Sequence, residues 1–124
     1  MTVDHRPTLP SEIERLKAMG VELNPGQTRL NGLAVSRALG DHFPKSVECG
    51  IVATPDVSQP IALTSNHALL IVASDGVWDV ISPQRAYEIA SAEKDTTAAA
   101  KRLIKAAVGN NKCNDNVTAI VVRL

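Results

Sequence analysis

The chain has 124 residues, with 13 basic and 13 acidic side chains and a formal net charge of zero. This length allows one domain or part of one, and the apolar fraction of 44% argues against a disordered chain. Zero net charge gives no support for a broad electrostatic nucleic-acid surface, so we expect no nucleic-acid partner. The longest apolar run, residues 68–73, is far shorter than the roughly 18 residues that suggest a membrane span, so we expect no membrane partner.

The cysteines and histidines do not form a recognisable framework. Cys49 and Cys113 give neither a disulfide scaffold nor the spacing of a zinc site, and the three histidines are scattered. The first residues also lack the apolar segment of a secretory signal peptide. We therefore expect free thiols in an intracellular protein of the cytoplasm or nucleus.

Three segments carry the start and stop signals of helices. The first is predicted to run from Ser11, which forms a capping-box pattern with Glu14, to a stop at Gly20. The second opens at Ser82-Pro83, a cap followed by proline at the first helical position. The third is expected from residue 95 or 96 to residue 108.

Four segments are predicted to be strands. Residues 33–35 and 50–53 are short candidates separated by a stretch, 40–50, that is typical of a loop. Residues 68–73 form the strongest candidate and are apolar on both faces, which predicts a central strand covered on both sides. Residues 117–122 are rich in β-branched side chains. Helices and strands mix without regular alternation, which favours the α+β class.

Two carboxylates stand out by position. Asp75 directly follows the strongest strand and Asp115 directly precedes the last segment, so both would lie at one end of the sheet if the strands were antiparallel neighbours. Ionised carboxylates that lie close together repel each other unless a cation lies between them. Mg²⁺ and Mn²⁺ prefer such oxygen ligands, and Asp79 could add a third carboxylate. The alternative is that Asp75-Gly76 and Asp115-Asn116 are simply turns.

Three segments together resemble a known family. They are LAVSRALGD at 33–41, SDGVWDV at 74–80 and DNVT at 115–118. In this order they closely resemble the metal-dependent protein serine/threonine phosphatases of type 2C. Smaller likenesses at Asp4-His5-Arg6-Pro7, Glu12, Arg15 and 53–57 extend the resemblance over nearly the whole chain.

The resemblance implies an αββα sandwich, in which two antiparallel sheets are flanked by helices. The family domain is about twice as long, so this chain would supply roughly its C-terminal half. We therefore expect residues 1–124 to form a single partial phosphatase domain, with a flap-like region at 1–32 and the C-terminal sheet and helices at 33–124.

The resemblance also implies a chemistry. Asp75 and Asp115 would be direct ligands of one catalytic Mg²⁺ or Mn²⁺, and Asp79 would help to bind a further, weaker metal. The implied reaction is hydrolysis of phosphoserine or phosphothreonine in a phosphoprotein substrate by a metal-activated water. No catalytic residue beyond these metal ligands is expected.

One family segment does not occur in this sequence. It is Asp-Gly-His-Gly, whose Asp bridges the two metals in the family. We therefore expect the isolated chain to lack full activity. Without the other half an apolar face would remain uncovered, which predicts pairing with an N-terminal half or self-association. The alternatives are a non-catalytic, phosphatase-like protein-binding module and a fragment with no independent role.

Overall fold

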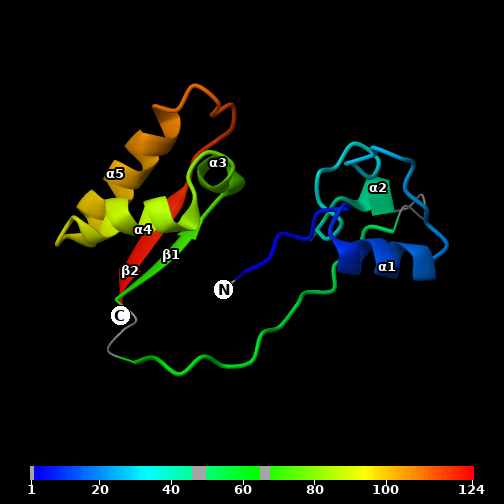
Figure 1. The fold of residues 1–124 in the computed structure, drawn as a ribbon, viewed down its shortest axis with the longest axis horizontal. Helices are drawn as coiled ribbons and strands as arrows, with labels where there is room; N and C mark the ends of the chain where they lie inside the picture. The colour runs from blue at the N-terminus through cyan, green and yellow to red at the C-terminus, as the bar shows by residue number, and fades with distance from the viewer. Residues whose placement is uncertain (1, 46–49, 65–67) are drawn as a thin grey trace. The chain divides into compact units, whose positions relative to one another are not determined.

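The computed structural model describes residues 2–45, 50–64 and 68–124. The described helices and strands, in chain order, are α1 (Pro10–Ala18), α2 (His42–Lys45), β1 (Leu69–Ala73), α3 (Asp75–Trp78), α4 (Pro83–Ser91), α5 (Thr96–Val108) and β2 (Ala119–Arg123) (Figure 1). They belong to two compact units, Met1–Gln59 and Pro60–Leu124. This mixture of helices with an antiparallel sheet confirms the α+β class. Cys49 lies outside the described residues, so the prediction for its thiol is not addressed.

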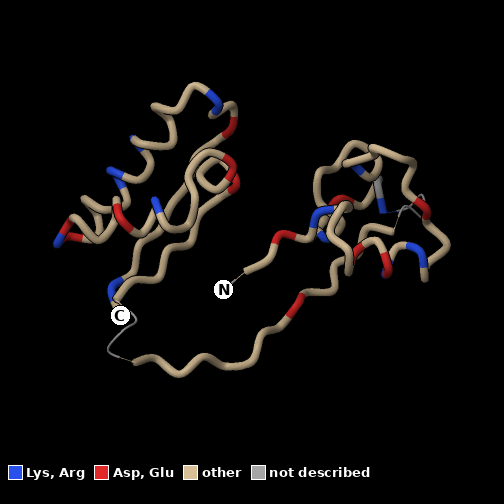
Figure 2. The backbone as a smooth tube through the Cα atoms, viewed as in Figure 1, with Lys and Arg blue, Asp and Glu red and all other residues tan. Residues whose placement is uncertain are grey.

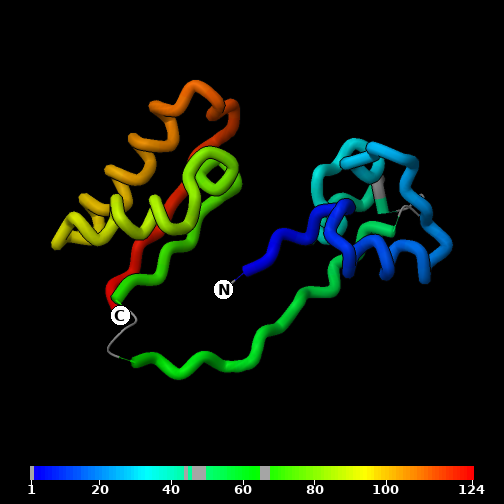
Figure 3. The backbone as a smooth tube through the Cα atoms, viewed as in Figure 1, coloured from blue at the N-terminus to red at the C-terminus, as the bar shows by residue number. Residues whose placement is uncertain are grey.

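The second unit is built around an antiparallel pair of strands. β1 and β2 lie side by side (Figure 3), with Leu69 opposite Arg123 and Ala73 opposite Ala119. Both strong strand predictions are thus confirmed, although β2 begins two residues later than expected. The antiparallel register brings the end of β1 and the beginning of β2 to the same end of the sheet.

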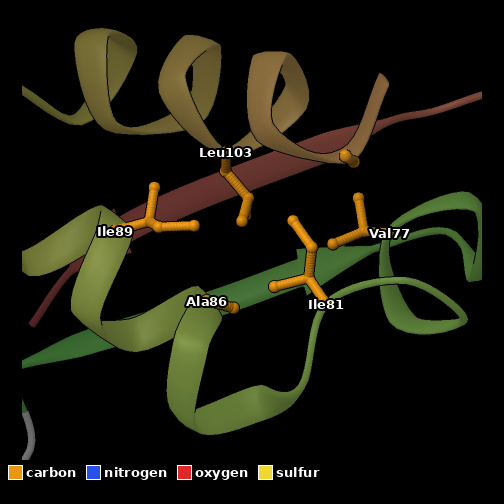
Figure 4. Close-up of a cluster of buried hydrophobic side chains, with 6 residues drawn as sticks. Val77, Ile81, Ala86, Ile89 and Leu103 are labelled. Atoms are coloured by element: carbon orange, nitrogen blue, oxygen red, sulfur yellow. The ribbon is translucent and has the colours of Figure 1, made fainter. Parts of the chain in front are cut away.

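One face of this sheet packs against α3, α4 and α5. Buried aliphatic side chains from the three helices and from the connection between α3 and α4 converge in the core (Figure 4), namely Val77, Ile81, Ala86, Ile89, Leu103 and Ala107. Ile71, Ala73 and Ala119 of the strands pack against them. Side chains alternate between the faces of a strand, so odd-numbered positions of β1 and β2 face these helices.

The opposite face of the sheet is uncovered. Val72, Ile120 and Val122 lie on it and are 53%, 57% and 40% exposed. Val72 is paired with Ile120, and Val122 with Leu70, so the exposed side chains are neighbours across the two strands. The prediction that residues 68–73 would be covered on both sides is therefore wrong within the second unit, because α3, α4 and α5 pack against one face of the sheet.

The helix ends of the second unit follow local sequence signals. The Ser82 hydroxyl accepts a hydrogen bond from the Arg85 amide, and the Asp95 carboxylate accepts one from the Ala98 amide at 2.6 Å. The predicted cap at Ser82 and the predicted start of the third helix at residue 95 or 96 are confirmed. In the first unit, α1 begins at Pro10 with Leu9 at the cap position and no side-chain cap. The capping box predicted at Ser11 is wrong, because Pro10 occupies the first helical position and places Ser11 inside the helix.

The first unit consists mainly of α1 and loops. Its small core contains Leu16, Leu30 and Ile51. The predicted strands 33–35 and 50–53 are wrong, since these stretches contribute only isolated bridges, Leu30 to Leu33 and Arg37 to Val52. The first bridge closes a tight turn whose central residues, Asn31 and Gly32, both have positive φ, so the chain at residues 30–33 turns instead of continuing as an extended strand. The loop expected at 40–50 contains the single helical turn α2.

No helix formed by the described residues is long and apolar enough to cross a membrane.

Candidate metal centre

Asp75 stands where β1 ends and the single turn α3 begins. Its carboxylate oxygen Oδ1 accepts a hydrogen bond from the Gly76 amide at 3.1 Å. The Trp78 indole, at the end of the same turn, donates to the carbonyl of Ala73 at 2.9 Å. This bond fastens α3 to the last residue of the strand. Asp75 is therefore an exposed carboxylate on a short, well-anchored turn.

Asp115 lies on the connection that leads from α5 into β2. Its Oδ1 accepts a hydrogen bond from the Asn116 amide at 2.7 Å, and the residue is exposed. The two aspartates thus share a pattern, in which one carboxylate oxygen is held by the next backbone amide. In the described part of the chain, the Oδ2 oxygen of each carboxylate makes no hydrogen bond.

Ser74 ties the two aspartate-bearing segments together. Its hydroxyl donates to the Asn116 carbonyl at 3.1 Å and accepts from the Thr118 amide at 3.1 Å, and its own amide donates to the Thr118 carbonyl at 3.0 Å. Figure 2 shows acidic residues on the α3 turn and on the neighbouring connection into β2. The structure therefore brings Asp75 and Asp115 to the same end of the sheet.

Glycine and cysteine allow the segments to approach closely. A Cβ atom built on Gly76 would overlap the carbonyl oxygen of Asn116 and lie 2.9 Å from its carbonyl carbon. The free thiol of Cys113 is half-buried and lies 3.7 Å from the Gly76 carbonyl oxygen and 3.8 Å from that of Asp115. Gly76 thus allows α3 to lie close to the connection into β2, and the Cys113 thiol contacts both segments.

Asp79 is exposed and follows α3, where its amide donates to the Asp75 carbonyl at 2.8 Å. Within residues 2–45, 50–64 and 68–124, no three side chains of His, Cys, Asp or Glu gather into a group that could hold a metal ion. The metal-ligand candidates at this end of the sheet are therefore the carboxylates of Asp75 and Asp115, and Asp79 is not counted with this pair. Two exposed carboxylates fit a hard divalent cation that keeps most of its water ligands.

A second polar cluster lies in the first unit, around Glu12. This carboxylate is fully buried. Its Oε2 accepts from Arg15 at 2.8 and 3.0 Å and from the Ser36 hydroxyl at 2.6 Å. Its Oε1 accepts from Arg37 at 2.5 and 3.1 Å. Both oxygens of the buried carboxylate therefore accept hydrogen bonds, and Glu12 holds α1 against residues 36–37.

The cluster continues to the surface through Arg37. This side chain also donates to Asp56 at 2.9 Å and to the carbonyl of Thr54 at 3.2 Å, and His5 contacts the other oxygen of Asp56 at 2.8 Å. Burial raises the pKa of Glu12, but hydrogen bonds from Arg37, Arg15 and Ser36 outweigh burial and lower that pKa from 4.5 to about 2. The hydrogen bonds from His5 and Arg37 likewise lower the pKa of Asp56.

Sequence reasoning missed this cluster as a unit. Its members come from four separate stretches, namely 4–7, 12–15, 33–41 and 53–57, each of which carried part of the family resemblance. The available signal was the set of charged residues inside those stretches. The stretch 53–57, compared with a family strand, is not a strand here and serves to present Asp56 to Arg37.

Comparison with known proteins shows the same family throughout. The family model for protein phosphatase 2C matches residues 1–117. A Dictyostelium discoideum protein named as a probable protein phosphatase is 51% identical over 124 residues, which is all of this chain but 12% of that protein. Protein phosphatase 2C 70 of Arabidopsis thaliana is 39% identical over 97 residues, covering 77% of this chain and 17% of that protein.

Solved structures agree with the sequence comparisons. The crystal structure of a serine-threonine phosphatase 2C from Toxoplasma gondii matches 99% of this chain with a TM-score of 0.76 and 28% identity, over 46% of that chain. A sex-determining protein of C. elegans matches with a TM-score of 0.78 and 25% identity, over 31% of that chain. The chain thus spans less than half the length of these relatives and corresponds to part of the αββα sandwich expected from the sequence. It belongs to the protein phosphatase 2C family.

Proposed function

We propose that this chain is the C-terminal part of a metal-dependent phosphatase that hydrolyses phosphoserine and phosphothreonine in proteins. Asp75 and Asp115 hold Mg²⁺ or Mn²⁺, and Asp79 assists with a further, weaker ion. The observation that carries the proposal is the pairing of two exposed carboxylates, from separate segments, at one end of the β1–β2 sheet. Membership of the protein phosphatase 2C family supports a metal-binding role for this pair of carboxylates.

The two aspartates contribute charge and position. Each keeps one oxygen on a backbone amide, which limits rotation of the carboxylate and leaves the other oxygen for a cation. When bound, the divalent ion lowers the pKa of a water molecule and neutralises charge on the phosphoryl oxygens. In the overall reaction the water oxygen bonds to phosphorus, the phosphorus–oxygen bond to the side chain breaks, and the serine or threonine hydroxyl leaves with a proton.

The isolated chain should bind metal weakly and should not turn over substrate. With two carboxylate ligands most coordination positions stay with water, so we expect a dissociation constant on the order of millimolar. The sequence also lacks the Asp-Gly-His-Gly segment of the family. Metal binding, rather than catalysis, is therefore the property to measure in this chain.

The test is Mn²⁺ binding followed by electron paramagnetic resonance, in which the signal of the aquated ion decreases on binding. Asp75→Asn and Asp115→Asn should each abolish the decrease. Asp95→Asn is the matched control, because Asp95 is an exposed aspartate of the same unit whose capping role asparagine can fill. Equal binding by all three variants and the parent chain would refute the proposed metal centre. A folded chain that binds no Mn²⁺ would refute it too and would favour the non-catalytic binding module.

The uncovered face of the sheet has a proposed occupant, the N-terminal part of a phosphatase domain. Val72, Ile120 and Val122 form an apolar patch, and the matching phosphatase structure is about twice as long as this chain. Buried apolar surface of this kind stabilises association at roughly 25 cal/mol per Å². A second sheet laid on this face would complete the sandwich.

This partner is tested by light scattering after size-exclusion chromatography. The chain is mixed with the part of the Toxoplasma gondii phosphatase 2C that lies outside the region matching this chain. A one-to-one complex that is lost in Ile120→Lys supports the proposal. A chain that stays monomeric in the mixture would refute this partner. A chain that forms only homodimers would refute it too, and would identify a second copy of the chain as the occupant of this face.

A further inference from the structure

We propose that Ser74 is a positioning residue that sets the spacing between Asp75 and Asp115. The proposal rests on the metal centre proposed above. Ser74 occupies the cap position of α3, yet its side chain makes no capping hydrogen bond. Its hydroxyl instead bonds across to the other strand segment, where it donates to the Asn116 carbonyl and accepts from the Thr118 amide.

These bonds use the hydroxyl in both of its capacities. A serine hydroxyl carries one donor and accepting lone pairs, and here the donor and an acceptor site both engage the segment next to Asp115. The chain neighbours of the bonded groups are the two aspartates, since Ser74 precedes Asp75 and Asn116 follows Asp115. The hydroxyl oxygen therefore adds two bonds between the aspartate-bearing backbones, beyond the strand pairing and the bond from the Ser74 amide to the Thr118 carbonyl.

Gly76 shows independently that this spacing is tight. A Cβ at this position would overlap the carbonyl oxygen of Asn116 and approach Val117 Cγ2 to 3.3 Å. The segments could not keep their present separation with any side chain at residue 76. The hydroxyl bridge on one side of Asp75 and the close backbone contact on the other hold the same two segments together.

Ligand spacing matters most for a divalent ion with strict geometry, such as Mg²⁺. Mg²⁺ requires oxygen ligands at 2.0–2.1 Å in near-ideal octahedral geometry. Groups that orient the direct ligands of a metal typically change its affinity by roughly 10–100-fold when they are removed. Asn116 and Thr118 are exposed, so water can replace the lost hydrogen bonds. The loss of the hydroxyl should therefore affect metal affinity much more than folding.

The experiment uses Tb³⁺, a hard cation whose luminescence can be excited through a nearby tryptophan. Trp78 is the only tryptophan of the chain and lies on α3 with Asp75. Ser74→Ala should weaken Tb³⁺ binding about 10–100-fold with an unchanged thermal midpoint. Ser74→Thr retains a hydroxyl and should bind as the parent chain does. The matched control is Ser91→Ala, which removes a hydroxyl bonded to the Glu88 carbonyl of α4.

The outcomes separate this inference from the metal centre itself. If Asp75→Asn loses Tb³⁺ while Ser74→Ala binds as tightly as the parent, the positioning role is wrong and the metal centre stands. If Asp75→Asn also binds as the parent does, the metal centre is wrong and the inference fails with it. Should Ser74→Ala not fold, Ser74→Cys, with a longer and weaker hydrogen-bonding group, replaces it, and parent-like affinity in that variant overturns the proposal.

Discussion

Removing Arg37 should destabilise the first unit strongly, because one oxygen of the buried Glu12 carboxylate then loses both of its donors. Glu12 is fully buried, and Arg37 supplies both hydrogen bonds to its Oε1. In Arg37→Ala that oxygen has no donor. Arg15 and Ser36 still hold the other oxygen, so the carboxylate remains ionised rather than neutral.

The magnitude follows from this partial loss. Breaking a buried ion pair by removing one partner typically costs 3–5 kcal/mol. Since Oε2 keeps its donors, we expect the lower end, about 3 kcal/mol. The matched control is Arg85→Ala, because Arg85 pairs with Glu88 at 3.0 Å with 65% and 48% of the two side chains exposed. An exposed pair of this kind contributes at most about 1 kcal/mol.

The assay is native-state hydrogen exchange read by mass spectrometry on peptides from α1. The single tryptophan and tyrosine of the chain lie in the second unit, so optical probes would miss the change. A loss of about 3 kcal/mol corresponds to opening that is a little over a hundredfold more frequent. Protection of α4 and α5 should not change, and Arg85→Ala should leave α1 unaffected. Equal protection of α1 in Arg37→Ala and Arg85→Ala would refute the view that Glu12 organises this unit.

Three further predictions concern pH, capping and core packing. Because the folded pKa of Glu12 is lowered from 4.5 to about 2, its contribution of at most about 3 kcal/mol is present above pH 4.5 and is lost as the pH falls towards 2; the exchange of α1 should show this loss, and Glu12→Gln should remove it. Asp95→Ala should cost about 1 kcal/mol in urea unfolding followed by Trp78 fluorescence, and Asp95→Asn close to nothing; equal costs would contradict a capping role. Leu103→Ala should cost about 2–5 kcal/mol in the same assay, and a cost below about 1 kcal/mol would show that this core is loosely packed.

The features that were predictable from the sequence are those decided by near neighbours. Ser82 and Asp95 cap helices through amides three residues away, and such contacts are present in the local pattern. The two strands with long β-branched or aliphatic runs also form as expected. Residues 33–35 and 50–53 have a similar composition, but among the described residues no second segment lies alongside them for more than a single bridge. A strand needs a partner, and short apolar runs do not show whether one exists.

The two proposed clusters differ in how far the sequence could reveal them. Asp75 and Asp115 flank strands whose antiparallel pairing was predictable, so their meeting at one end of the sheet follows from topology. The bonds that Ser74 makes depend on register to the residue, which the pattern does not determine. The local pattern around Glu12 did not predict its burial, because one of its two arginine partners, Arg37, comes from a distant stretch of the first unit, whereas Arg15 lies one turn away on α1.

The central residues of the family-like stretch 33–41 make contacts that hold the first unit together. Ser36 and Arg37, at its centre, both bind the carboxylate of Glu12, and the bond of Arg37 to Asp56 joins a further family-like stretch to them. Ser36 and Arg37 therefore act together on one buried group, because each donates to a different oxygen of the Glu12 carboxylate. A strong match over 33–41 therefore identifies the fold. Evidence for the proposed phosphatase chemistry has to come from the segments around Asp75 and Asp115, whose exposed carboxylates each have one oxygen bonded to the next backbone amide.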